Sequence, residues 1–206
     1  CNVPAPKLVK EGYILPPKVK VYKSEIRQKD EITFDVECNQ IIDNIDDHKT
    51  KKILVCAKAT KQIKGLVYYP KFVYELKCRG YDYMYITAKT GAVINGEKVT
   101  RDEFFETLSA WGKDDDKKFV VLHHSILAEG INVKGLEAVL FLRSMDYIGI
   151  SQTIGRVIRK GNESKTYGLV CVPVYSKVGI STARKVQAVV DTIFEKGQPA
   201  ISTITR

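Results

Sequence analysis

The 206-residue chain has no apolar run long enough to cross a lipid bilayer, and no secretion signal is recognisable ahead of its first predicted strand. Its five cysteines are odd in number and widely spaced, and no two of them form a Cys-x-x-Cys pair. This spacing argues against a disulfide framework and against a zinc site. We therefore expect no membrane contact, no bound metal, and reduced thiols in a cytoplasmic or nucleoid-associated protein.

The sequence also lacks a phosphate-binding loop, which needs a lysine directly after its second glycine. Residues 91–96 have glycines at the right spacing, but Glu97 stands where the lysine is needed and would repel phosphates. Residues 114–116 are aspartates between lysines, a pattern typical of a solvated turn. His123 and His124 would point to opposite faces of a strand and cannot chelate one ion together. We expect one of these histidines either to lie near a cleft or to be buried with hydrogen-bond partners.

The chain does have an excess of positive charge. Its 33 lysines and arginines outnumber its 24 aspartates and glutamates, which gives a formal net charge of +9. This balance suits a polyanionic partner such as nucleic acid, although a soluble basic protein without such a partner has the same composition. The length suits one α/β domain. Because the chain opens on Cys1 rather than on methionine, we expect it to be part of a longer polypeptide.

Apolar runs typical of strands alternate with segments of helical periodicity. We expect a loop at residues 58–64 and an irregular connection at residues 88–99. Thr100 and Glu103 are spaced as a capping box at a helix start. The alternation predicts an α/β fold with a mainly parallel central sheet and helices on both faces. The expected strands are 19–22, 52–57, 83–87, 119–122, 137–142 and 167–172, and the expected helices are 35–47, 70–79, 100–111, 146–161 and 181–196.

The most informative stretch is QTIGRVIR, residues 152–159. Positions three and four apart share a helix face, so Gln152, Arg156 and Arg159 are expected to project together. Gly155 would leave space beside them for a nucleotide or another backbone. Arginine stays charged and pairs bidentately with phosphate oxygens, so the pattern favours a phosphate clamp. The alternative is an amphipathic helix that carries two arginines by chance.

A second segment lies upstream. The predicted strand 119–122 leads into a glycine-containing polar loop, and a second strand then precedes the arginine helix, which Asp146 and Gly161 are expected to cap and close. In open α/β sheets, ligands bind at the carboxyl ends of the strands, where this loop and the start of the helix would lie. Together, LAEGINVKGLEAVLFL (residues 127–142) and QTIGRVIR resemble motifs V and VI of superfamily two helicases, in the second of their two RecA-like lobes.

The resemblance implies roles for individual residues. Arg156 and Arg159 match the motif VI arginines, which reach across a cleft to the γ-phosphate of ATP, with the second as the arginine finger. Asn132 stands where the family usually has aspartate, so its role differs at least in charge. Residues 52–64 resemble motif IV, whose loop faces nucleic acid, although its lysines could instead only solvate the loop. The implied nucleotide-binding residues are Gln152, Gly130 and Asn132, and the implied nucleic-acid-binding residues are Lys58, Lys61, Lys64 and Ser125.

The resemblance also implies a three-layer RecA-like domain over residues 25–206, with residues 1–24 as an inter-lobe linker or an edge segment. The implied function is the second motor lobe of an ATP-dependent helicase or translocase. ATP and Mg²⁺ would be held mainly by a first lobe that this sequence does not contain, so the fragment alone should be inactive. Its partners would be that lobe and nucleic acid, with DNA favoured over RNA. The alternatives are a non-catalytic nucleic-acid-binding module and the motor of a restriction or remodelling system.

Overall fold

The computed structural model of the chain describes residues 3–23, 33–124, 133, 135–161, 165–174 and 177–197. Eight strands form one sheet in the order β1-β8-β7-β2-β6-β3-β4-β5. Only the pairings of β3 with β4 and of β4 with β5 are antiparallel, so the predicted mainly parallel sheet is confirmed. The strands are β1 (Pro17–Lys23), β2 (Lys52–Cys56), β3 (Asp82–Thr87), β4 (Gly91–Ile94), β5 (Glu97–Val99), β6 (Phe119–His123), β7 (Ala138–Phe141) and β8 (Gly168–Val174).

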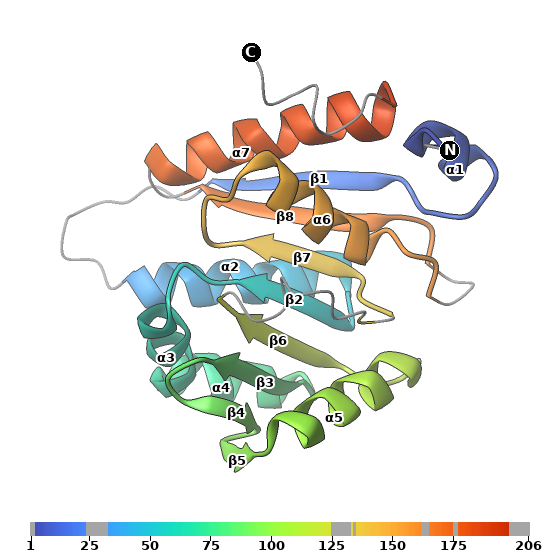
Figure 1. The fold of residues 1–206 in the computed structure, drawn as a ribbon. Helices are drawn as coiled ribbons and strands as arrows, with labels where there is room; N and C mark the ends of the chain where they lie inside the picture. Colours follow the sequence, from blue (N-terminus) through green and yellow to red (C-terminus); the bar gives the residue numbers. More distant parts are fainter. Residues whose placement is uncertain are drawn as a thin grey trace.

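Helices cover both faces of the sheet and give the fold three layers (Figure 1). One face carries α2, α3 and α4, and the other carries α5, α6 and α7. The central strands are therefore buried on both sides, which explains why they read as continuous apolar runs. The helices are α1 (Ala5–Lys10), α2 (Thr33–His48), α3 (Thr60–Tyr68), α4 (Pro70–Cys78), α5 (Arg101–Lys113), α6 (Tyr147–Val157) and α7 (Lys177–Val189), followed by the π-helix η2 (Val190–Glu195).

Alternate residues of each strand feed two separate cores. In β2, Leu54 and Cys56 face the core beneath α5, α6 and α7, whereas Ile53 and Val55 face the core beneath α2, α3 and α4. All five residues of β2 are buried. None of the helices in the described part of the chain combines the length and hydrophobicity that a membrane span requires.

The connection at residues 88–99 is not irregular as predicted. It forms a hairpin of β4 and β5 that extends the sheet beyond β3. Asn95 and Gly96 make its turn with φ values of 51° and 95°. An Asn-Gly pair between short apolar strands is a strong hairpin signal, because both residues tolerate positive φ. The glycine spacing at residues 91–96 thus belongs to this hairpin.

Two helix starts match their sequence signals. Thr100 accepts a hydrogen bond from the Glu103 amide while the Glu103 carboxylate accepts one from the Thr100 amide, so the capping box of α5 is confirmed. Asp146 caps α6 as predicted, because its Oδ1 accepts the Gly149 amide at 2.6 Å. The last helix begins at Lys177, earlier than predicted, and its final six residues form η2, whose wider turn buries Val190 and Phe194.

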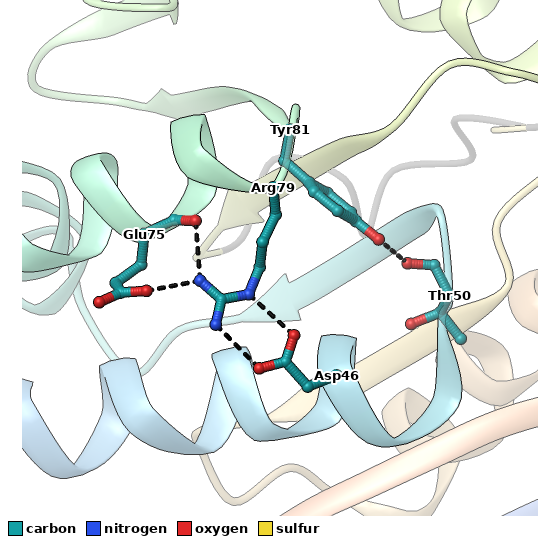
Figure 2. Close-up of polar contacts among 5 residues, drawn as sticks. All are labelled: Asp46, Thr50, Glu75, Arg79 and Tyr81. Atoms are coloured by element: carbon teal, nitrogen blue, oxygen red, sulfur yellow. Dashed lines mark hydrogen bonds and ion pairs between the residues drawn. The ribbon is translucent and has the colours of Figure 1, made fainter.

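An ion-pair cluster ties α2 to α4 (Figure 2). Arg79 donates from Nε and Nη2 to the two carboxylate oxygens of Asp46, both at 2.8 Å. Its Nη1 donates to the Glu75 carboxylate at 2.5 Å. Next to it, the Tyr81 hydroxyl donates to the Thr50 carbonyl at 2.5 Å. These contacts fix the end of α2, from which the chain enters β2.

The two ends of the described chain also meet. Helix α1 packs against η2. A β-carbon built on Gly197 would lie 3.0 Å from Pro4 Cβ and 3.1 Å from Pro6 Cδ, so the Gly197 backbone packs closely on these two proline rings. Gly197 has a φ of 71°, which suits glycine in particular.

Candidate nucleotide and nucleic-acid site

Three parallel strands end together at the carboxyl edge of the sheet. Cys56 at the end of β2 is in register with His123 on β6 and with Phe141 on β7. The chain leaves each strand there toward residues that the sequence marks as functional. The predicted site residues Ser125, Gly130 and Asn132 follow β6 and lie outside the described residues.

Helix α6 begins beside this edge and carries the predicted arginine motif in its second half. Its apolar side, Ile150, Ile154 and Val157, is fully buried against the sheet. Gln152 lies on the outer side and is exposed, while Arg156, four residues later, is partly buried. The helix thus presents both polar side chains on one face. Gly155 borders open space, because a β-carbon built at this position would meet nothing within 4 Å.

Arg159 is not on the helix, which corrects the prediction of a helix closed by Gly161. Helix α6 ends at Val157, and Arg159 forms an antiparallel bridge with Ile14. The Leu15 amide donates to the Ile158 carbonyl at 2.7 Å. The segment before β1 therefore takes over the backbone pairing that a further helical turn would have supplied. The charge of Arg159 still acts on Arg156, so the two guanidinium groups remain near each other.

Lys165 also stops the helix, and the sequence analysis missed it. Its Nζ donates to the carbonyls of Leu136 and Val157, both at 2.5 Å, and of Arg159 at 3.0 Å. A cation that donates to the last carbonyls of a helix satisfies groups that otherwise lack partners. Burial lowers the pKa of Lys165 to about 8. A lysine eight residues after the helix end gives no local signal of this role.

Positive charge gathers around a buried pair at the carboxyl edge. The Nε2 of His123 lies 3.3 Å from Cys56 Sγ. Burial first, then the charges of Arg156 and Arg143, lower the pKa of His123 to about 3. Burial raises the pKa of the Cys56 thiol to about 12. Both groups are therefore neutral at pH 7 and form no thiolate–imidazolium pair.

Arg156 is a half-buried cation close to other cations. Burial, and second the charge of Arg159, lower the pKa of Arg156 below the usual range of arginine. Arg143, which follows β7, donates from Nη1 to the His124 carbonyl and was also missed by the sequence analysis. A partly buried guanidinium close to other cations gains more from an incoming phosphate than an exposed one does, because water screens it less.

The three predicted lysines lie after β2 at the same edge. Residues 58–64 are not a loop as expected: Lys61 and Lys64 belong to the first turns of α3, and only Lys58 precedes it. The Lys58 amide donates to Gln62 Oε1 at 2.5 Å, which holds the turn into the helix. Ala59 is the N-cap residue and makes no side-chain cap. The start of α3 therefore combines backbone N–H groups with lysine side chains, both of which attract phosphate.

Metal binding has no support in the described part of the chain, where no three His, Cys, Asp or Glu side chains gather as ligands. The aspartates at residues 114–116 follow α5 at a turn. Asp116 is almost fully exposed there and pairs with Lys51 at 3.4 Å.

No protein-family model and no curated protein matches this sequence. Solved structures do match its fold. A DNA-bound ATP-dependent Type ISP restriction-modification enzyme, LlaBIII, matches 94% of this chain with a TM-score of 0.68 and 16% identity. A putative HsdR subunit fragment of a type I restriction enzyme from Vibrio vulnificus YJ016 matches 89% with a TM-score of 0.63 and 11% identity. The C-terminal domain of the DEAD-box protein Dbp5 matches 84% with a TM-score of 0.52 and 14% identity.

The chain spans 15% of the length of the Type ISP enzyme, 35% of the HsdR fragment and 82% of the Dbp5 domain. At these low identities the similarity concerns the fold. The parallel sheet, the helices on both of its faces and the capped helix α6 are the observed features of this fold. The chain has a three-layer RecA-like fold, which it shares with the two restriction enzymes and with the C-terminal domain of Dbp5.

Proposed function

We propose that this chain is the second motor lobe of an ATP-dependent helicase or translocase. In this proposal a first lobe of the same polypeptide binds ATP and Mg²⁺. Arg156 and Arg159 complete that site across a cleft, with Gln152 as a polar neighbour. Ser125, Gly130 and Asn132 belong to the same edge by sequence. Closing and opening of the cleft would shift the two lobes along a bound strand.

The observation that carries this proposal is the arrangement of the two arginines. Arg156 is held on the capped helix α6, and Arg159 is held just beyond it by the bridge to Ile14. Two neighbouring cations of this kind repel each other. An oxyanion between them would relieve that repulsion, and a phosphoryl group in transfer carries its charge on several such oxygens.

Nucleic acid is the proposed second ligand of the carboxyl edge. Lys58 and Lys61 are exposed at the start of α3, and Lys64 is partly exposed one turn later. Phosphate contacts from such lysines carry no sequence preference. We expect DNA in preference to RNA, in keeping with the DNA-bound restriction enzyme among the structural neighbours.

A motor of a restriction system is the variant of this function that one observation favours. The two restriction enzymes match this chain with TM-scores of 0.68 and 0.63, against 0.52 for the Dbp5 domain and 0.50 for the C-terminal part of the Fun30 ATPase domain. The shape of this lobe is thus nearer to that of the restriction motors. A non-catalytic nucleic-acid-binding module remains the alternative, and the next experiment separates the two.

The test is steady-state ATP hydrolysis and strand binding, measured on the same variants of the parent polypeptide. Arg159→Ala should lower ATP turnover on the order of a thousandfold, the usual scale for an arginine finger. Arg159→Lys should restore little, because lysine lacks the planar fork. Strand binding without nucleotide should stay close to wild type. Arg184→Ala, at an exposed arginine of α7, is the matched control and should leave turnover unchanged.

The opposite pattern would support the binding module. If Arg159→Ala weakened strand binding while hydrolysis per bound complex stayed normal, Arg159 would be a contact to the phosphate backbone. The chain by itself should hydrolyse ATP no faster than buffer, because it lacks the residues that hold the β-phosphate and magnesium. Turnover by the purified chain that Arg159→Ala abolishes would remove the need for a first lobe.

A further inference from the structure

The edge strand β1 leaves one of its faces partly uncovered. Lys18, Lys20 and Tyr22 alternate along the face on the α2 side, because successive side chains of a strand point to opposite faces. Helix α7 packs on the other face of β1, whereas α2 packs over the neighbouring strand β8 (Figure 1). Lys18 and Lys20 are consequently exposed at the rim of the sheet.

Both lysines lie over tyrosine rings. The Nζ of Lys18 is 5.0 Å from the ring centroid of Tyr167, which directly precedes β8. The Nζ of Lys20 is 5.9 Å from the ring of Tyr22. These cation–π contacts hold the two ammonium groups in defined places while leaving them open to solvent. A ligand therefore meets two positioned charges about two residues apart on one strand.

A pocket of about 160 Å³ continues this face at the amino ends of β2, β7 and β8. This volume is several times the roughly 30 Å³ that one water takes in the liquid. The pocket is lined by three segments that meet there: residues 48–50 at the end of α2 and just after it, Glu137 before β7, and residues 165–167 before β8.

His48 gives the pocket an available hydrogen-bonding atom. Its Nε2 is buried and makes no hydrogen bond among the described residues. Burial lowers the pKa of His48, and the charges of Lys20 and Lys18 act in the same direction, while Asp47 opposes them. An anion in the pocket would reverse the effect of the lysines and supply the missing partner.

The charge balance favours an anion. Lys18, Lys20 and Lys49 outnumber the two carboxylates, Asp47 and Glu137, by one. Lys165 adds a further cation to the lining, although its Nζ is held by three carbonyls. One carboxylate is already engaged, because Glu137 Oε2 accepts the Lys51 amide at 2.5 Å. We call the surface formed by Lys18, Lys20, His48, Lys49 and Tyr167 the amino-edge patch.

We propose that the amino-edge patch is a second contact for the phosphate backbone of a nucleic-acid strand, with one phosphate in the pocket beside His48. This proposal rests on the proposed function only because it takes nucleic acid as the partner. The patch lies at the opposite end of the strands from Lys58. The five residues of β2 separate the two edges by about 17 Å. A strand would have to pass around the β1 side of the domain to touch both.

The test is binding of a fluorescent single-stranded oligonucleotide of about 30 nucleotides to the purified chain, over a series of salt concentrations. Three triple glutamine variants are compared: K18Q/K20Q/K49Q in the patch, K58Q/K61Q/K64Q at the carboxyl edge, and K77Q/K89Q/K98Q at exposed lysines elsewhere. Each removes three charges. The patch variant should lower the logarithmic salt slope by about 2, at about 0.7 per phosphate contact. The third variant should lower it by less than about 0.5.

The second readout is the His48 ring signal in NMR. It should shift on addition of the oligonucleotide, and its pKa should rise, since a bound phosphate favours the protonated ring. K18Q/K20Q/K49Q should abolish both changes without altering the His123 signal. Polyglutamate at equal charge should produce neither change.

The other possible results show whether the amino-edge patch or the proposed function is wrong. A patch variant that keeps the wild-type slope while the carboxyl-edge variant loses slope overturns the patch and leaves the proposed function standing. Equal losses in all three variants mean attraction to overall charge, which also overturns the patch. A polyglutamate response at His48 makes the patch a surface for acidic protein segments instead. Loss only in the patch variant supports the patch and removes the carboxyl-edge lysines from the proposed function.

Discussion

Replacing His123 by phenylalanine should abolish much of the loss of stability that the chain undergoes between pH 7.5 and pH 5. His123 is buried beside Cys56, and its pKa is lowered to about 3 from an ordinary value of 6.5. In this pH window the unfolded chain takes up a proton at His123 and the folded chain does not. Acid therefore favours unfolding through this residue.

The expected size follows from that pKa difference. Because the folded pKa is depressed, the contribution to stability is complete above about pH 6.5 and is lost as the pH falls toward 3. At pH 5 the loss is about 2 kcal/mol, from roughly 1.5 pH units at 1.36 kcal/mol each. For a domain of this size it corresponds to a fall in melting temperature of about 4–8 °C.

Urea unfolding at pH 7.5, 6.5, 5.5 and 5.0 measures this loss. At pH 7.5 both side chains are uncharged, so wild type and His123→Phe should differ there only by the fixed cost of fitting the larger ring and losing the contact to Cys56. Their curves should separate as the pH falls. His48→Phe replaces a half-buried histidine and should remove a smaller part of the loss. Parallel curves for wild type and His123→Phe would show that His123 takes up its proton in the folded state, and the argument from burial would be wrong.

Four further changes test the packing by urea unfolding at pH 7. Arg79→Ala should destabilise the chain by on the order of 1 kcal/mol, since its partner carboxylates are partly exposed, and a larger loss would mean that the cluster is better shielded than its exposure indicates. Lys165→Met should cost about 2–4 kcal/mol, because three carbonyls lose their donor; an unchanged midpoint would contradict this. Gly135→Ala should lower the free energy of unfolding by several kcal/mol, since its φ is 82° and its β-carbon would lie 2.3 Å from a backbone oxygen. Gly155→Ala should instead stabilise α6 by roughly 0.5–1 kcal/mol, because a β-carbon there meets nothing within 4 Å. Equal effects of the two glycine changes would refute the geometric argument.

Local chemistry made part of this fold predictable. The capping box at Thr100 and the cap at Asp146 each depend on residues within three positions, so the sequence contains the whole interaction. The central strands were predictable because burial on both faces requires a continuous apolar run. The hairpin at residues 91–99 is also encoded locally, because Asn95 and Gly96 tolerate the positive φ of its turn, and the predicted irregular connection was wrong there.

The end of α6 could not be predicted in the same way. Lys165 and Leu15 terminate the helix from segments that are distant in the sequence or approach it only in the folded sheet. Residues near Arg159 show a helical pattern that tertiary contacts override. The surroundings of His123 are likewise nonlocal, since Cys56, Arg143 and Arg156 come from three different elements. The expectation of functional arginines nevertheless rested on their identities, which do not depend on where the helix stops.

The packing of α1 against η2 has a consequence for protein engineering. Since Pro4 and Gly197 are in near contact, a short peptide could join these two positions without stretching. New ends could then be opened at the exposed turn of Asn95 and Gly96, far along the sheet from α6. Such a circular permutant keeps every strand pairing while reversing which half of the domain is made first. The arginine helix would then be synthesised before β2 and β3, which would allow its folding to be studied apart from theirs.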